Sequence, residues 1–178
     1  MTKFSERNLA PRVLQAIAEA GYETPTPIQA GAIPPALEGR DVLGIAQTGT
    51  GKTAAFAIPL IQRTDAGRKQ TQALVLCPTR ELCVQVAKDI TALSRYVKGL
   101  KVLAVYGGAS IEHQIKSLRR GIHIVVATPG RLHDLIRRGR VDSAAIGTGV
   151  LDEADEVLQM GFQDELNAIL DVARRDKS

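Results

Sequence analysis

The sequence predicts an α/β fold in which a mostly parallel sheet carries helices on both faces. Five short apolar runs that suit strands alternate with segments that suit helices, and three of these runs are unbroken, as expected of strands buried on both faces. Polar turns follow these runs. Ligands of parallel α/β sheets bind at the carboxyl ends of the strands, so these turns are the predicted functional edge.

Two helices are expected near the start of the chain. Asn8 can cap a helix over residues 11–20, and proline in the first turn suits a second helix from Thr26 to about residue 37. The connection between them, residues 21–29, is stiffened by two prolines. The apolar face expected for the first helix comprises Val13, Leu14, Ile17 and Ala18.

The remaining elements follow in alternation, beginning with an apolar strand over residues 42–46 and a helix that starts at about residue 54. Thr79 can cap the next helix, and residues 64–70 suit a surface loop. The further strands are expected at 72–77, 101–106, 123–127 and 149–151, and the further helices at 80–96, 111–120, 132–138 and 164–174.

A glycine-rich stretch between the first strand and its helix suits a phosphate-binding loop. Glycines let backbone N–H groups face phosphate oxygens, Lys52 adds a positive charge, and the Thr53 hydroxyl suits Mg²⁺. The strict pattern G-x-x-x-x-G-K-[ST] has glycine where this chain has Ala46. A chance surface loop is the alternative, which the flanking elements disfavour. The stretch comprises Ala46, Gln47, Thr48, Gly49, Thr50, Gly51, Lys52 and Thr53.

Two adjacent carboxylates follow the last predicted strand. Asp152 is expected at the carboxyl edge of the sheet, where it can hold Mg²⁺ directly or through water, and Glu153 can polarise an attacking water. An acidic helix start, favoured by the helix dipole, is the alternative. Phosphoryl transfer depends on positioning and charge stabilisation, so a phosphate loop together with these carboxylates indicates nucleotide hydrolysis.

Composition narrows the classes of partner. The net charge of +4 makes a polyanion plausible, while 3% aromatic residues and no Trp argue against a base-stacking surface, so nucleic acid would be held by its backbone. Cys77 and Cys83 have no zinc spacing, and the scattered histidines suggest no metal site. No apolar run is long enough to cross a membrane and the start lacks a signal-peptide core, so we expect no membrane association and a cytoplasmic location.

Taken together, these residues resemble the amino-terminal RecA-like P-loop domain of DEAD-box ATP-dependent RNA helicases. The sequence Asp152-Glu153-Ala154-Asp155 spells the family name, and alanine is common in this family at the position of Ala46. The resemblance covers nearly all of residues 1–178. The other matching stretches are residues 21–29 (the Q motif), 46–53 (motif I), 78–82 (motif Ia), 107–108 (the double glycine) and 128–131 (motif Ib).

The resemblance implies roles for these residues. Gln29 would hydrogen-bond adenine, Phe4 would pack on the base, and motif I would bind ATP with Mg²⁺ on Thr53 and Asp152. Catalysis would involve Glu153, Lys52 and Asp152, and Asp155 would couple the ATP site to a later Ser-Ala-Thr motif. The residues implied to contact RNA phosphates and sugars are Pro78, Thr79, Arg80, Gly107, Gly108, Thr128, Pro129, Gly130 and Arg131.

The chain departs from the family in two respects. It stops at Ser178, before the expected Ser-Ala-Thr motif and before a second RecA-like (carboxy-terminal helicase) domain, so we expect a domain that lacks its partner. Gly147 and Gly149 stand where the family usually has bulky aliphatic residues. Glycine weakens a strand interior, so the strand before Asp152 is expected to be short or irregular.

Three functions are consistent with these patterns. The first is the ATP- and RNA-binding half of an RNA-dependent ATPase that unwinds short RNA duplexes, with hydrolysis requiring the second domain. The second is an ATP-gated RNA clamp or assembly platform in which unwinding is incidental. The third is a small P-loop kinase, which leaves motifs Ia and Ib unexplained. The sequence does not indicate protein partners.

Overall fold

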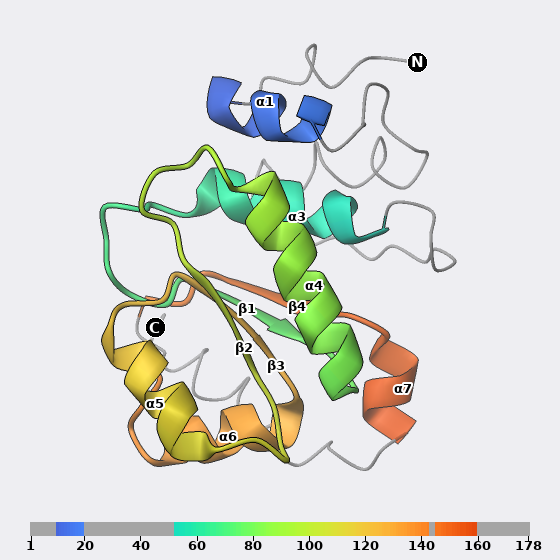
Figure 1. Cartoon of the computed structure of the whole chain (residues 1–178). Coiled ribbons are helices and arrows are strands. Elements are labelled where there is room, and N and C mark those ends of the chain that lie inside the picture. Colours follow the sequence, from blue (N-terminus) through green and yellow to red (C-terminus); the bar gives the residue numbers. More distant parts are fainter. Residues whose placement is uncertain (1–9, 20–51, 143–144, 160–178) are drawn as a thin grey trace. The chain divides into compact units, whose positions relative to one another are not determined.

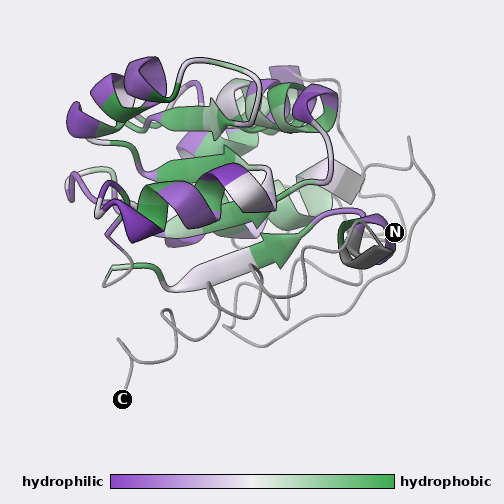
Figure 2. Cartoon of the chain, turned by 90° about the horizontal axis from the view of Figure 1, so that it is seen from below, coloured by the Kyte–Doolittle hydropathy of each residue, from purple (hydrophilic) through white to green (hydrophobic). Residues whose placement is uncertain are grey.

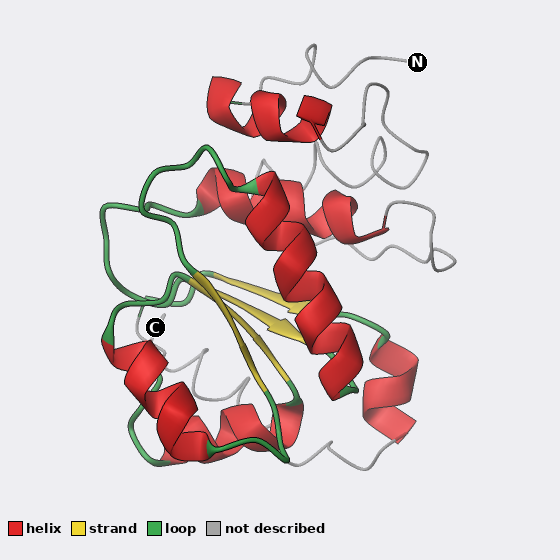
Figure 3. Ribbon diagram, in the orientation of Figure 1, coloured by secondary structure: helices red, strands yellow, loops and turns green. Residues whose placement is uncertain are grey.

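The structure of the protein is a computed structural model that describes residues 10–19, 52–142 and 145–159 (Figures 1 and 3). The chain divides into two compact units, Met1–Asp65 with Lys88–Leu100, and Ala66–Ala87 with Lys101–Ser178. The elements are α1 (Pro11–Glu19), α3 (Lys52–Arg63), β1 (Ala73–Leu76), α4 (Arg80–Leu93), β2 (Val102–Val105), α5 (Ile111–Arg119), β3 (Ile124–Ala127), α6 (Pro129–Arg137), β4 (Thr148–Leu151) and α7 (Ala154–Gln159).

In the first unit, α1 and α3 confirm two of the predicted helices. The buried residues of α1 are Val13, Ala16 and Ile17, spaced by three and four as on one helical face. The prediction that Ala18 belongs to this face was wrong, because the face is centred one position earlier and Ala18 is exposed. The predicted cap Asn8 and the predicted helix over residues 26–37 lie outside the described residues.

Polar contacts tie both ends of α1 to the rest of the first unit. The backbone N–H of Ala10 donates to Oε1 of Gln62 at 3.1 Å. At the other end, the Glu19 carboxylate accepts a hydrogen bond from the Tyr96 hydroxyl and pairs with Arg95 at 3.3 Å. The hydrogen bond to Glu19 stabilises the protonated hydroxyl and thereby raises the pKa of Tyr96 above its ordinary value.

The second unit is built on a four-stranded parallel sheet in the order β2-β3-β1-β4. These strands confirm four of the five expected, and the fifth, residues 42–46, lies outside the described residues. The strand β4 is short, as expected for the strand before Asp152, but it pairs regularly with β1. Gly149 lies opposite Leu74, and the pale start of β4 in Figure 2 reflects its lack of large apolar side chains.

The helices of this unit cover both faces of the sheet. In Figure 1, α5 and α6 lie below the sheet and the start of α4 lies on its other side. This arrangement follows from right-handed crossovers, because β2 to β3 and β3 to β4 step in one direction across the sheet whereas β1 to β2 steps in the opposite direction.

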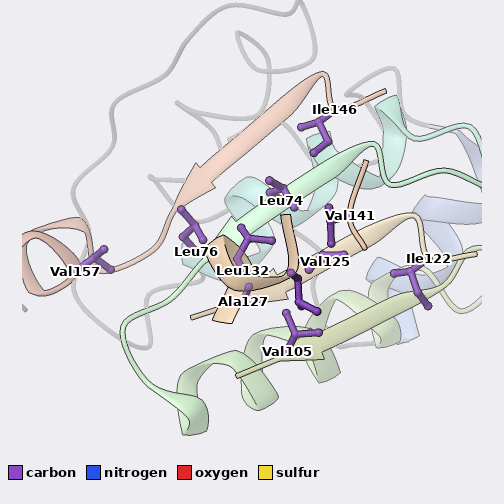
Figure 4. Packing of buried hydrophobic residues seen from close by; sticks show 11 residues of the cluster. Leu74, Leu76, Val105, Ile122, Val125, Ala127, Leu132, Val141, Ile146 and Val157 are labelled. Atoms are coloured by element: carbon purple, nitrogen blue, oxygen red, sulfur yellow. The ribbon is translucent and has the colours of Figure 1, made fainter. Parts of the chain in front are cut away.

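The main core lies between the sheet and the helices α5 and α6. Strand side chains alternate between the faces, so Leu74 and Leu76 point toward Leu132 (Figure 4), while Val75 and Val126 are buried on the opposite face. The core cluster comprises Leu74, Leu76, Val105, Ile122, Val125, Ala127, Leu132, Leu135, Val141, Ile146 and Val157.

Two helix boundaries differ from the prediction. α4 ends at Leu93 rather than near residue 96. α6 begins at Pro129 rather than Leu132, because Thr128 is the N-cap and proline suits the first helical position. Thr64–Gln70 connects α3 to β1 without a helix or strand, as predicted. Among the described helices, none combines the length and apolar character that a membrane span requires, and the helix expected at 164–174 lies outside them.

A buried histidine links the starts of β2 and β3 to the loop that leads into β1. His123 is 2% exposed, and its Nδ1 lies 3.0 Å from the backbone N of Lys101. Because Lys101 can only donate there, Nδ1 accepts and the ring proton resides on Nε2, which donates to the carbonyl O of Ala66 at 3.0 Å. One neutral ring therefore satisfies a backbone donor and a backbone acceptor.

We expect His123→Leu to lower the free energy of unfolding by about 2–4 kcal/mol, because two part-buried backbone groups, Lys101 N–H and Ala66 C=O, lose their hydrogen-bond partner. The matched control is His113→Leu on the exposed surface of α5, which should change stability by about 0.5 kcal/mol or less. Urea unfolding of both variants makes the comparison. Equal losses for the two variants would contradict the role given to His123.

Candidate nucleotide and RNA-backbone site

The four strands of the second unit end at the same level. Val105, Ala127, Leu76 and Leu151 lie opposite one another across the sheet. The next residue of three strands continues the ladder by one bond: Thr128 N to Val105 O (3.1 Å), Cys77 N to Ala127 O (2.9 Å) and Asp152 N to Leu76 O (2.8 Å). The polar turns predicted from the sequence therefore emerge together at one edge.

Motif Ia is shaped by a helix cap. Pro78 is buried, and Oγ1 of Thr79 accepts from the backbone N–H of Leu82 at 3.2 Å, which confirms Thr79 as the N-cap of α4. Arg80 is exposed, with its guanidinium carbon 4.9 Å from the centre of the Tyr106 ring. This cation–π stacking directs an exposed cation toward the end of β2.

The double glycine follows β2 after one residue, Tyr106, and is open to solvent. Gly107 and Gly108 are both exposed, and a Cβ added to either would meet no described atom within 4 Å. Gly108 has a φ of +85°, which side-chain-bearing residues rarely adopt. The turn therefore leaves space for a ligand to approach its backbone.

Motif Ib presents its arginine to this same turn. Arg131, half-buried on the first turn of α6, donates from both terminal nitrogens to the carbonyl O of Ala109, each at 3.1 Å, and from NH1 to Oε1 of Gln114 at 2.9 Å. The sequence predicted RNA contact for Arg131 but not these internal bonds. The helix α6 has Thr128 as its N-cap and begins with Pro129, which is buried, and Gly130.

Sequence reasoning missed Gln114 and the part played by Tyr106. Gln114 is 6% exposed, and its Nε2 donates to the carbonyl O of Tyr106 at 3.2 Å. The signal was present, since Gln114 interrupts the apolar stripe formed by Ile111, Ile115 and Leu118 on α5. A polar residue at such a position needs hydrogen-bond partners.

The acidic motif begins at the same edge. Asp152 is 3% exposed directly after β4, Glu153 is half-buried, and Asp155 is exposed on α7. Among the described residues, Glu153 is the non-glycine residue with positive φ, at 52°. Strained backbone of this kind persists where the surroundings impose it and is frequent at functional sites.

The other half of the predicted nucleotide site belongs to the first unit. Lys52 begins α3, and Thr53 is half-buried in its first turn. Phe4, Gln29 and residues 46–51 lie outside the described residues. The donors Thr53 and Asp152 are a hydroxyl and a carboxylate, the oxygen types that Mg²⁺ prefers, so their chemistry fits that ion.

Comparison with known proteins gives one consistent family. A family model described as "DEAD/DEAH box helicase" matches residues 26–178. The chain is 51% identical over 169 residues to ATP-dependent RNA helicase DeaD of Escherichia coli K12, covering 95% of this chain and 27% of that protein. It is 52% identical over 167 residues to the ATP-dependent RNA helicase DeaD of Mycobacterium tuberculosis H37Rv, covering 94% of this chain and 30% of that protein.

A solved structure agrees. The crystal structure of a DEAD box protein from the hyperthermophile Methanococcus jannaschii matches with a TM-score of 0.92 and 43% identity, covering 99% of this chain and 48% of that chain. The α/β fold predicted from the sequence is thereby confirmed. The chain spans less than a third of the length of the DeaD relatives just named.

We expect Thr79→Ala to lower the free energy of unfolding by about 1 kcal/mol, because Leu82 N–H loses its capping acceptor. Thr79→Ser keeps the hydroxyl and should retain most of the stability. Urea unfolding of the two variants measures the difference. A cap role would be refuted if alanine and serine were equally tolerated.

Proposed function

Because the chain belongs to the DEAD/DEAH box helicase family, we propose that it is the ATP- and RNA-binding half of an RNA-dependent ATPase that separates or remodels short RNA duplexes. The observation that supports this most directly is the common level of the strand ends. It gathers motif Ia, the double glycine, motif Ib and the acidic motif at one edge of the second unit. A small P-loop kinase has no support from the family match.

ATP binding is proposed for motif I, with Gln29 reading adenine and Phe4 packing on the base. Lys52 would neutralise phosphate charge, and Thr53 and Asp152 would hold Mg²⁺, which supplies charge stabilisation to the phosphoryl group when bound. Burial supports the role of Asp152, since a carboxylate that is 3% exposed can hold a cation with little competition from solvent. Glu153 would orient and polarise the attacking water.

RNA binding is proposed through sugar and phosphate. The helices α4 and α6 both begin at the edge where the double glycine lies, so their N-terminal N–H groups and partial positive charge face that edge. The guanidinium of Arg80, the first residue of α4, adds a full positive charge there. Such contacts distinguish no bases, which suits a chain with 3% aromatic residues and no Trp. The phosphate contact of Arg131 stays a prediction.

Unwinding is proposed for the full-length protein. A second RecA-like domain would close on ATP and RNA, bend one strand and release the other, with Asp155 contributing to the coupling. The length of the relatives supports this, since the chain covers 27% of the E. coli protein. By itself, the domain is expected to bind ATP but to hydrolyse it poorly.

We expect Glu153→Gln in the full-length protein to retain ATP binding while lowering ATP turnover by about 100-fold or more, because the amide cannot accept a proton from water. Lys52→Ala should instead abolish ATP binding. Titration with labelled ATP and phosphate release separate the two effects.

The matched control for the first variant is Glu156→Gln, an exposed carboxylate on α7, which should leave turnover unchanged. Normal hydrolysis by Glu153→Gln would remove this residue from the mechanism. Retained ATP affinity in Lys52→Ala would contradict the phosphate-loop assignment.

We expect Arg80→Gln to weaken binding to single-stranded RNA equally for all base sequences. Loss of one phosphate contact should reduce the slope of log affinity against log salt by about 0.7. Fluorescence anisotropy over a salt series measures it. The control is Arg119→Gln, which changes an exposed arginine at the C-terminal end of α5. A loss of affinity with Arg80→Gln that depends on the base sequence would argue against backbone recognition.

A further inference from the structure

The double-glycine turn is held at both ends by one buried side chain and its partner. Gln114 donates to the carbonyl of Tyr106, which directly precedes Gly107 (3.2 Å). It accepts from Arg131 (2.9 Å), which in turn donates two hydrogen bonds to the carbonyl of Ala109, which directly follows Gly108 (3.1 Å each). The amide and the guanidinium thus close a brace around the turn.

The turn needs such a brace because its own residues supply little order. Glycine has the largest conformational freedom of any residue, and no described side chain packs against the place where a Cβ would stand at Gly107 or Gly108. Openness suits a ligand that approaches the backbone, but a flexible turn loses conformational entropy when that ligand binds. Fixing both flanking carbonyls removes much of this cost before binding.

The charges of the groups that bond Arg131 also matter for RNA binding. The partners of Arg131 in these bonds are two neutral oxygens, the Ala109 carbonyl and the Gln114 amide. In the described part of the chain, no carboxylate forms an ion pair with it. Neutral partners hold the guanidinium in place without cancelling its charge, which remains available to attract phosphate.

We propose that Gln114 is a positioning residue for RNA binding: acting through Arg131, it preorganises the Gly107-Gly108 turn for a sugar-phosphate backbone and fixes the arginine through neutral hydrogen-bond partners. This inference rests on the proposed RNA-binding function of the same edge. Glutamine suits the position because it donates to one carbonyl and accepts from the arginine while carrying no charge.

The first experiment observes the turn without RNA. The ¹⁵N heteronuclear NOE of the Gly107 and Gly108 amides should be that of ordered backbone in the unmodified chain and should fall to that of a flexible loop in Gln114→Met, which keeps the side-chain length but makes neither hydrogen bond. Ser117→Ala is the control, because its hydroxyl bonds only locally to His113 O at 3.2 Å on the same helix. Unchanged glycine NOE values in Gln114→Met would overturn the brace.

The second experiment measures binding of a short labelled oligouridylate over a salt series at a temperature where each variant is folded. Gln114→Met should weaken binding about five- to tenfold, as expected for losing hydrogen bonds that order the site, without changing the salt slope. Gln114→Glu keeps an acceptor for Arg131 but neutralises it, so it should weaken binding and also flatten the slope. Ser117→Ala should bind as the unmodified chain does.

The outcomes distinguish a failure of RNA binding from a failure of the positioning role alone. If the unmodified chain does not bind the oligouridylate, the proposed RNA-binding function fails and the positioning role fails with it. If it binds, and both Gln114 variants bind equally well with unchanged slopes, only the positioning role is refuted. A loss of affinity in Gln114→Met with normal ATP affinity and ordered folding supports the proposal, since a merely structural residue would lower stability alone.

Discussion

The in-register pairing of β1 with β3 and β4 is the interaction on which the candidate site depends. It aligns Leu76 with Ala127 and Leu151, so that the residues following these strands emerge at one level. A slip of one residue would turn Leu74 and Leu76 away from α5 and α6 and would also separate the turns. The core and the functional edge are therefore specified by the same hydrogen bonds.

At that edge, rigid and open features are combined. The turns are fixed by a helix cap at Thr79, by the ladder bond of Asp152 and by the hydrogen bonds of Gln114 and Arg131. Their exposed parts include Gly107, Gly108 and the Arg80 cation. Such a surface suits recognition of a repeating anionic backbone by shape and charge, which is the RNA contact proposed for this edge.

Short-range sequence patterns predicted the features that depend on residues close together in the sequence. The apolar runs predicted the four described strands, and Thr79 caps α4 as expected, since both depend on residues close in sequence. Pattern reasoning was wrong for Ala18 because the direction of a helical face depends on what packs against it. It missed Gln114, whose partners Tyr106 and Arg131 are contributed by other elements.

The sequence by itself determined the α/β class, the alternation of strands with helices and the motifs that identify the family, because each is encoded in short-range spacing. Only the tertiary structure decided that Arg131 is bonded to Ala109 and Gln114, and that Arg80 stacks on Tyr106. The physical reason is that a side chain's hydrogen-bond partners depend on which strand ends the sheet places side by side, and residues far apart in sequence carry no local record of that neighbourhood.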